Sequence, residues 1–176
     1  NKPAIVILSD YAKVVLSDAM CKAIIKECNF SGIPVIADPK GLDYSKYQGA
    51  TALTPNKKET AEACGVSMND NKALLDGAKE LKKKLGLKFL AVTRGEEGIS
   101  LLEGSDERHI AATAKQVFDV SGAGDTVIAT LAAGLIHGLT AQEALELANT
   151  AAGIVVGKVG TVPINRDELL NELSAK

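Results

Sequence analysis

Residues 117–128 read Val-Phe-Asp-Val-Ser-Gly-Ala-Gly-Asp-Thr-Val-Ile, and this stretch decides how the rest of the chain is interpreted. It predicts a short apolar strand, then a glycine-rich loop that opens a helix. The first backbone N–H groups of a helix have no intrahelical partner, so the amides of Gly122, Ala123 and Gly124 are predicted to form an anion pocket. Asp125 places a carboxylate at the pocket's edge, where it would be a poor phosphate ligand, so we expect a base. The alternative is a plain turn in which Asp125 only favours the helix start.

The same stretch carries a family resemblance. Asp119-Val-Ser-Gly-Ala-Gly-Asp125 resembles the D-[TV]-[TS]-G-A-G-D signature of the ribokinase-like (PfkB) family of sugar and nucleoside kinases. The resemblance implies that Asp125 is the catalytic base. It also implies that the amides of residues 122–124 form an anion hole for the phosphoryl group in transfer. Both roles agree with those predicted from the loop itself.

The composition predicts one compact domain, residues 1–176, that acts on a small molecule. The 176 residues are 46% hydrophobic, which is enough for one core. Because 20 Lys and Arg are interspersed with 22 Asp and Glu, we expect no contact with nucleic acid or a membrane surface. No apolar run approaches the ~20 residues that span a bilayer, so the expected location is cytoplasmic. The chain begins at Asn1 with no initiator Met, which indicates a fragment.

Strands and helices alternate along the chain, which predicts a doubly wound α/β fold: a mostly parallel sheet with helices on both faces. Strands are expected at 4–8, 33–37, 50–53, 89–93 and 99–102, with an antiparallel edge at 108–111 and a last strand entering residue 117. Helices are expected at 17–28, 57–64, 69–85, from 122 to about 137, 141–157 and 166–174.

Some side-chain environments also follow from spacing. In the helix at 17–28 the inner face is expected to carry Leu16, Met20, Ala23 and Ile24. In the helix at 69–85 the residues Lys79, Lys82, Lys83 and Lys84 are expected to form a solvated face. The three cysteines, Cys21, Cys28 and Cys64, lack disulfide or zinc spacing and are predicted to be buried or partly buried thiols.

The segment Asn56-Lys57-Lys58-Glu59 is the first candidate for a nucleotide site. Taken alone, Asn56 and Glu59 have the spacing of a helix capping box. The segment also resembles the N-x-x-E element of the kinase family. That resemblance implies that all four residues lie by the triphosphate, with Glu59 holding Mg²⁺ through water and Asn56 assisting.

Two further segments complete the candidate nucleotide site. Thr93, Gly95 and Gly98 match a T-x-G-x-x-G element, which the family places beside the phosphates; the alternative is a plain hairpin turn. Asn149 and the segment from Lys158 to Gly160 match the part of the family that borders adenine. The alternative for Asn149 is a buried amide satisfied near the end of a helix.

Charged residues at strand ends are the candidates for the sugar substrate. Asp10, Lys13, Asp38 and Lys40 follow predicted strands, where open α/β sheets bind ligands; the alternative is loop capping and surface ion pairs. Residues 8–13, 38–44 and 149–161 resemble the branch of the family that phosphorylates D-glycero-D-manno-heptose 7-phosphate. Val14 departs from the Gly of that branch, which leaves the role of Lys13 open.

The resemblance implies an ATP-dependent kinase with Mg²⁺ and a monovalent cation as cofactors and a sugar phosphate as substrate. It covers the C-terminal portion of such a kinase, with the N-terminal part and the lid outside the chain. It also implies a homodimeric parent protein and allows a nucleotidyltransferase domain to follow. Two alternatives remain open: another ribokinase-like sugar or nucleoside kinase, and a non-catalytic nucleotide-binding module.

Overall fold

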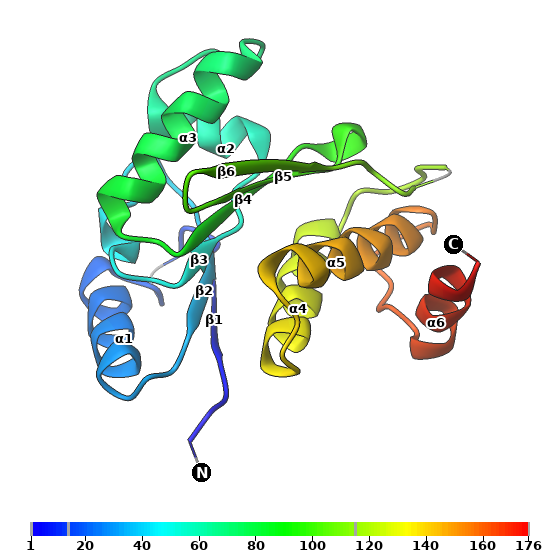
Figure 1. Ribbon diagram of the computed structural model, residues 1–176, viewed down its shortest axis with the longest axis horizontal. Helices are drawn as coiled ribbons and strands as arrows, with labels where there is room; N and C mark the ends of the chain where they lie inside the picture. Colours follow the sequence, from blue (N-terminus) through cyan, green and yellow to red (C-terminus); the bar gives the residue numbers. More distant parts are fainter. Residues whose placement is uncertain (1, 14, 115, 176) are drawn as a thin grey trace. The chain divides into compact units, whose positions relative to one another are not determined.

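The computed structural model describes residues 2–13, 15–114 and 116–175. The chain groups into two compact units, the first Asn1–Arg94 with Ser100–Arg108, the second Gly95–Ile99 with His109–Lys176. Figure 1 labels the elements of both units. The single domain inferred from composition stays a prediction.

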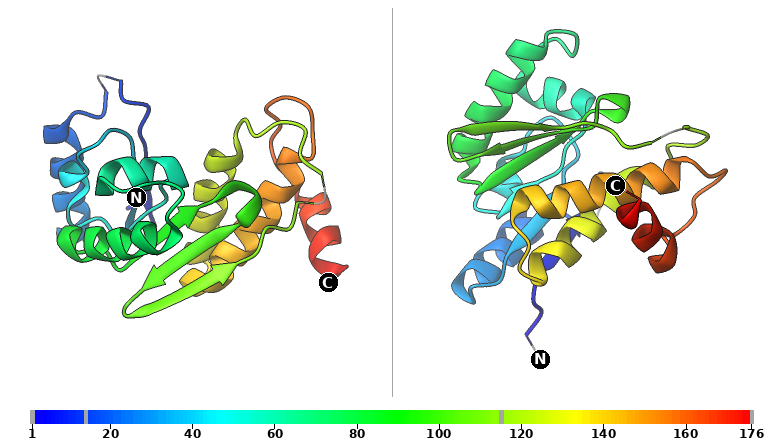
Figure 2. Two further views of the ribbon diagram at one scale, coloured as in Figure 1. Left: turned by 90° about the horizontal axis from the view of Figure 1, so that it is seen from above. Right: turned by 45° about the vertical axis from the view of Figure 1, so that its right-hand side comes forward.

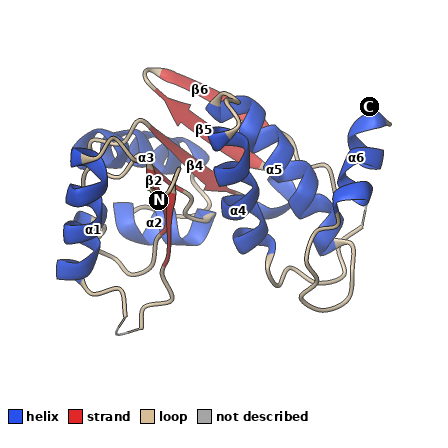
Figure 3. Cartoon of the chain, turned by 90° about the horizontal axis from the view of Figure 1, so that it is seen from below, coloured by secondary structure: helices blue, strands red, loops and turns tan. Residues whose placement is uncertain are grey.

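A six-stranded sheet has the order β1-β2-β3-β4-β5-β6. Its parallel part contains β1 (Val6–Ser9), β2 (Val35–Asp38), β3 (Ala52–Leu53) and β4 (Phe89–Thr93), each strand pairing in parallel with the next. The strands are drawn in red in Figure 3. The central strands are apolar runs because parallel strands are covered on both faces. Val35, Ile36 and Ala37 are accordingly fully buried.

The last two strands extend the sheet beyond β4. A short helical turn, η2 (Gly95–Glu97), leads into β5 (Ile99–Glu103), and β6 (Asp106–Ile110) follows after a two-residue turn. The two strands form the long green hairpin in Figure 2. The strands predicted at 89–93 and 99–102 are present and are neighbours in the sheet. The edge strand begins at Asp106, earlier than its predicted start at residue 108.

Three helices of the first unit begin at side-chain caps that are visible in the sequence. Ser17 caps α1 (Asp18–Phe30), Asn56 caps α2 (Lys57–Cys64) and Asp70 caps α3 (Asn71–Leu85). Each cap accepts a hydrogen bond from a backbone N–H that the helix leaves unsatisfied. The predicted bounds of these helices are correct to within two residues.

The predicted inner face of α1 is correct only in part, since Leu16 and Ile24 are partly buried against the core and the other two residues are not. The buried side chains are Cys21, Ile25 and Cys28, whereas Met20 is 49% exposed and Ala23 is exposed. Both sets fit a helical stripe, and only the approach of α1 to its neighbours selects one of them. The prediction that the cysteines are buried or partly buried is confirmed, since Cys64 is partly buried.

The lysine face of α3 also needs one correction. Lys82 is 8% exposed, and its Nζ donates to the carbonyl oxygen of Gly104 at 2.5 Å, in the turn between β5 and β6. The aliphatic stem of lysine can be buried while its amine reaches a polar partner. Lys82 therefore ties the hairpin to the helix instead of facing solvent.

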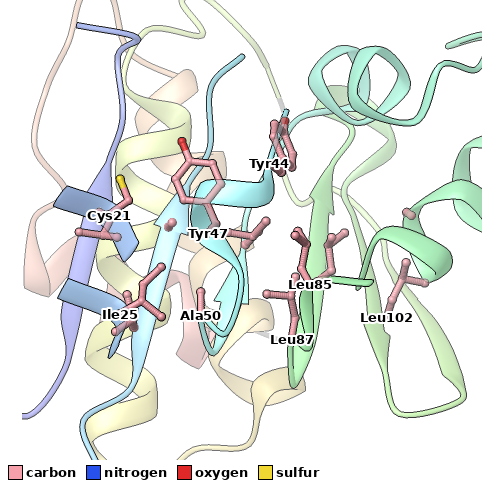
Figure 4. Packing of buried hydrophobic residues seen from close by; sticks show 14 of the residues in the cluster. Cys21, Ile25, Tyr44, Tyr47, Ala50, Leu85, Leu87 and Leu102 are labelled. Atoms are coloured by element: carbon pink, nitrogen blue, oxygen red, sulfur yellow. The ribbon is translucent and has the colours of Figure 1, made fainter. Parts of the chain in front are cut away.

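The core of the first unit lies between the sheet and its helices. The short helical turn η1 (Ser45–Tyr47) contributes Tyr47, which is fully buried, and Tyr44 at its start is 2% exposed. The two rings meet edge to face with centroids 5.8 Å apart. Figure 4 shows both rings among the buried apolar side chains, and their hydroxyl groups point the same way.

The second unit is built from α4 (Ala123–Ile136), α5 (Ala141–Val156) and α6 (Arg166–Ser174). α4 and α5 pack closely, because a Cβ added to Gly134 would lie 2.8 Å from the Cβ of Ala144. The strand predicted to enter residue 117 is wrong. Residues 116–120 form a loop whose Phe118 N–H donates to the carbonyl oxygen of Val156 at 2.8 Å. No helix among the described residues combines the length and the apolarity that a membrane crossing requires.

Candidate active site

The carboxyl ends of the parallel strands gather most candidates of the first unit at one edge of the sheet. Asp10 follows β1, Asp38 ends β2, and Thr93 ends β4. Asn56 follows β3 and forms an isolated parallel bridge with Thr93. Open α/β sheets bind ligands at this edge, so the fold places these residues where a binding site is expected.

Asn56 and Glu59 form the capping box that their spacing predicts. The Glu59 N–H donates to Asn56 Oδ1 at 2.9 Å, and the Asn56 N–H donates to Glu59 Oε2 at 2.8 Å. The capping box considered as the alternative to a nucleotide contact is therefore present, and it fixes the Glu59 carboxylate at the sheet edge. Of the two lysines between them, Lys57 is partly buried and Lys58 is exposed.

Lys40 extends from the turn after β2 and forms an ion pair with Glu59 through its Nζ. The side chains are 32% and 13% exposed, respectively. Both oxygens of Glu59 are thus engaged, one by an ammonium group and one by a backbone amide. A positive charge therefore already sits on the carboxylate that the sequence resemblance predicts to face Mg²⁺.

The residues at this edge fit Mg²⁺ in its usual protein setting. Mg²⁺ keeps several waters and is held by one or two carboxylates together with substrate phosphates. Glu59 and Asn56 are the carboxylate and amide side chains at this edge that would hold the ion through water, and both already accept hydrogen bonds within the capping box. Among the described residues, no three His, Cys, Asp or Glu side chains gather closely enough to hold a metal ion without a nucleotide.

Asp10 is buried in a network that the sequence did not reveal. Its Oδ2 accepts hydrogen bonds from Lys46 Nζ and from the Tyr47 hydroxyl, both at 2.6 Å, and its Oδ1 accepts from the Ala12 N–H at 2.8 Å. Burial by itself would raise the pKa of Asp10, but these hydrogen bonds outweigh it and hold the pKa below its ordinary value. Lys46 and Tyr47 lie 36 and 37 positions along the chain from Asp10, so no local pattern could have identified them.

The other substrate candidates of the first unit differ in exposure. Lys13 is exposed, and Asp38 is partly buried. Val14, the departure from the family pattern, lies outside the described residues. The turn after β1 is strained, because Ala12 has a φ of +55°, which is unusual for a residue other than glycine.

In the second unit, local bonds shape the glycine-rich loop. Asp119 Oδ1 accepts from the Ser121 N–H at 2.8 Å. This hydrogen bond, together with those from the Ser121 hydroxyl and the Gly160 amide, lowers the pKa of Asp119. Gly122 has a φ of +79°, a left-handed conformation that a side chain would strain. The first intrahelical bond of α4 then runs from the Thr126 N–H to the Gly122 carbonyl oxygen at 2.9 Å.

Asp125 stands in the first turn of α4 and is exposed, as the loop pattern predicts. Gly124 beside it is also exposed, and an added Cβ there would meet nothing within 4 Å. The Ala123 N–H donates to the Val120 carbonyl oxygen at 3.2 Å, so part of its capacity goes to the turn. The anion pocket thus stays a prediction, with the helix start and the carboxylate in the expected order.

The T-x-G-x-x-G segment has a structural use for its second glycine. Gly98 has a φ of +91°, and a Cβ there would lie 2.0 Å from the Ile110 carbonyl oxygen. The chain's own backbone therefore requires this glycine. Gly95 opens η2 and has nothing within 4 Å of an added Cβ, which leaves its surroundings open.

The adenine candidates are also engaged within the second unit. Asn149 is 7% exposed, and its Nδ2 donates to the Ala111 carbonyl oxygen at 2.7 Å. This is the satisfied buried amide considered as its alternative. Lys158 forms an ion pair with Glu168 at 2.6 Å, and Gly160 has a φ of +81°. Contact of these residues with adenine stays a prediction.

A parallel sheet with a polar carboxyl edge, together with a glycine-rich loop that opens a helix, is an architecture of α/β proteins that bind phosphate-bearing ligands. The family model described as pfkB family carbohydrate kinase matches residues 1–167. The chain therefore belongs to the pfkB family of carbohydrate kinases.

Relatives and solved structures agree with this family. The chain is 65% identical over its full length to the bifunctional protein HldE of Methylobacillus flagellatus, and 54% identical over 98% of its length to that of Magnetococcus marinus. It spans 36% of the length of each of these relatives.

Among solved structures, the ribokinase of Arabidopsis thaliana complexed with ribose and ATP matches with a TM-score of 0.84 and 27% identity, over 97% of this chain and 55% of that one. Phosphofructokinase-2 from Escherichia coli, at 17% identity and a TM-score of 0.86 over 97% of this chain and 56% of that one, supports the fold. The predicted α/β fold class and the family resemblance are confirmed.

Proposed function

We propose that this chain is the nucleotide-binding and catalytic portion of an ATP-dependent kinase that phosphorylates the anomeric hydroxyl of D-glycero-D-manno-heptose 7-phosphate. One observation carries the proposal. A left-handed Gly122 opens α4 and is followed in its first turn by the exposed carboxylate of Asp125. Phosphoryl transfer needs such a base together with backbone donors for the transferred oxygens. The resemblance of residues 8–13, 38–44 and 149–161 to heptose 7-phosphate kinases supports the choice of sugar.

The proposal gives each group of candidates a role. Asp125 accepts the proton of the sugar hydroxyl, and the amides of Gly122, Ala123 and Gly124 stabilise charge on the transferred phosphoryl group. Mg²⁺, when bound, would supply positive charge that offsets the charge of the nucleotide phosphates. Glu59 and Asn56 orient it through water, and Lys40 binds phosphate oxygens.

The remaining roles follow the family pattern. Lys57, Lys58, Thr93 and Gly95 contact the nucleotide phosphates, and Asn149, Lys158 and Gly160 border the adenine. Asp38 and Lys13 contact the sugar phosphate. A cytoplasmic location, a homodimeric parent protein and a monovalent-cation requirement rest on the family resemblance and belong to the same proposal.

The test is a phosphoryl-transfer assay on the complete gene product that contains this chain. It is supplied with ATP and a panel of heptose 7-phosphate, ribose, fructose 6-phosphate and nucleosides. We expect transfer to heptose 7-phosphate, and we expect Asp125→Asn to reduce it by ~10²-fold or more while ATP binding in calorimetry is kept. Asp167→Asn is the matched control, because Asp167 also occupies the first turn of a helix in the same unit.

The outcomes separate the parts of the proposal. Transfer to another acceptor of the panel would overturn the proposed sugar substrate and leave the assignment as a kinase intact. An Asp125→Asn variant that loses ATP affinity as strongly as activity would contradict its role as a base. ATP binding without transfer to any acceptor would favour the non-catalytic module.

A further inference from the structure

We propose that Asp10, Lys46 and Tyr47 form a buried positioning cluster that fixes the backbone of Lys40 and so holds the Lys40 side chain beside Glu59. The inference rests on the proposed function in one respect, namely that Lys40 faces phosphate. It reassigns Asp10, the sequence-based candidate for substrate binding, to a positioning role. It also adds Lys46 and Tyr47 to the residues on which the site depends.

Burial and hydrogen bonds within the chain close the Asp10 carboxylate to a substrate. Its side chain is 1% exposed, and its two oxygens accept three hydrogen bonds, from Lys46, Tyr47 and the Ala12 N–H. A buried carboxylate that is fully satisfied in this way is costly to disturb, because any donor it loses leaves charge unpaired in a poorly solvated place. Asp10 therefore acts on the site through the residues it holds.

The Tyr47 hydroxyl connects Asp10 to Lys40. It donates to Asp10 Oδ2 at 2.6 Å and accepts from the Lys40 N–H at 3.1 Å. The ring is fully buried, and the Tyr47 N–H donates to the Tyr44 carbonyl oxygen at 2.9 Å, so the hydroxyl has little freedom to move. The end of β1 and the turn after β2 are thus joined through one phenol oxygen.

Lys46 neutralises the negative charge of Asp10, the carboxylate that the Tyr47 hydroxyl links to Lys40. Its Nζ lies 2.6 Å from Asp10 Oδ2 and 5.1 Å from the centroid of the Tyr47 ring, and its side chain is 12% exposed. The ammonium group and the phenol therefore share one carboxylate oxygen. Without Lys46, Asp10 would be a buried anion held by neutral donors alone.

Lys40 is constrained at both ends as a result. Tyr47 fixes its backbone N–H, and its Nζ pairs with Glu59, which the capping box on α2 orients in turn. A flexible lysine side chain gains a defined position only when its surroundings restrict it. The cluster supplies that restriction from the side of β1.

The first arm of the test measures hydrogen exchange at the Lys40 amide, using mass spectrometry that resolves single amides on the complete gene product. Tyr47→Phe removes the acceptor and is expected to speed exchange at Lys40 by about tenfold. Tyr44→Phe is the matched control, because the Tyr44 hydroxyl is buried in the same hydrophobic core as Tyr47 and has no hydrogen-bond partner among the described residues. Unchanged exchange at Lys40 in Tyr47→Phe would overturn the proposal.

The second arm measures kinetics in a double-mutant cycle. Tyr47→Phe is expected to lower kcat/KM by about tenfold to a hundredfold through misplacement of Lys40, and Tyr44→Phe to leave it within about twofold. In a Lys40→Met background, Tyr47→Phe should have no further effect, because Tyr47 acts through Lys40. A loss of equal size in both backgrounds would contradict this role.

Two variants of Lys46 test whether its positive charge is what the cluster requires. Lys46→Arg keeps the charge and is expected to retain most of kcat/KM, whereas Lys46→Met is expected to lose it. Equal losses in both would argue against a role through charge. If the wild-type protein transfers phosphate to no acceptor, the proposed function fails, and hydrogen exchange at Lys40 still decides whether the cluster holds its backbone.

Discussion

The polar sheet edge of the first unit and the glycine-rich loop of the second are built by opposite means. At the sheet edge, side chains from separate elements hold one another, as Asp10 holds Lys46 and Tyr47. In the loop, the bonds join neighbours such as Asp119 with Ser121, or Gly122 with Thr126. The first arrangement depends on tertiary contacts, while the second depends on backbone conformation.

Burial follows the same division. Asp10 is 1% exposed and engaged on both oxygens, whereas Asp125 is exposed in the first turn of its helix. A buried charge is committed to its partners, while an exposed carboxylate at a helix start remains accessible to a ligand. We therefore expect the sheet edge to position the site and the proposed chemistry to lie in the loop.

The largest expected effect on stability comes from breaking the buried ion pair. Lys46→Met leaves the Asp10 carboxylate buried without its cation and is expected to lower the free energy of unfolding by about 3 kcal/mol. Urea denaturation of the wild type and the variant measures the change. A loss below about 1 kcal/mol, as for a surface pair, would remove the distinction between the two regions.

At low pH, protonation of Asp10 should lower the free energy of unfolding. A carboxyl group whose pKa is lowered by folding contributes stability that is present above its unfolded pKa of about 3.9, and that is lost as the pH falls through its folded pKa. The pKa of Asp10 is lowered in this way by Lys46, Tyr47 and Ala12, against the effect of burial. We therefore expect the stability difference between the wild type and Asp10→Asn to be constant near pH 6 and to shrink below about pH 4. Urea midpoints across that range test this, and a difference that does not change with pH would contradict it.

A smaller loss of stability is expected from a change in the glycine-rich loop, whose conformation depends on the backbone of Gly122. Gly122→Ala puts a side chain on a residue with a φ of +79°, with Thr161 Cγ2 only 3.1 Å from the new Cβ. We expect a loss of about 1–2 kcal/mol in thermal or urea unfolding. Gly124→Ala is the control for stability, because its φ is not positive and nothing lies within 4 Å of its Cβ. If both variants lost the same stability, the conformation of Gly122 would not be the cause.

The smallest effect is expected for the exposed ion pair of the second unit. Lys158 and Glu168 are 32% and 45% exposed, so Lys158→Met should change the free energy of unfolding by no more than about 0.5 kcal/mol. The same variant tests the predicted nucleotide contact, since a fall in ATP affinity without a change in stability would support it. A stability loss as large as that of Lys46→Met would show that the exposed pair of the second unit matters as much as the buried pair of the first.

Much of the fold could be predicted because its signals are local. The caps Ser17 and Asn56 and the strand at 89–93 were all readable, and so was the helix at 166–174. The strand expected at residue 117 was not formed, since its apolar side chains remain exposed: Val117 at 56% and Phe118 at 63%. An apolar run becomes a strand only when a partner strand is available.

The site divides in the same way. Asp125 and Gly122 follow one another in a recognisable order, so the sequence indicated them without a structure. Asn149 and Gly98 were indicated for a nucleotide, yet the structure shows contacts within the chain that the sequence did not reveal: a hydrogen bond to Ala111 and a close approach to Ile110. A polar residue or a glycine can serve a ligand contact or a contact within the chain, and sequence spacing does not distinguish the two roles.

Local sequence signals specify where most elements begin and end, which loop opens α4, and to which family the chain belongs. Caps, glycines and apolar periods act over a few residues, so they can be read along the chain. Tertiary structure alone decided which face of α1 is buried, that Lys82 is enclosed, and that Asp10 is held by Lys46 and Tyr47. These contacts join residues that lie 36 and 37 positions apart in the case of Asp10, and only the packing of separate elements brings such partners together.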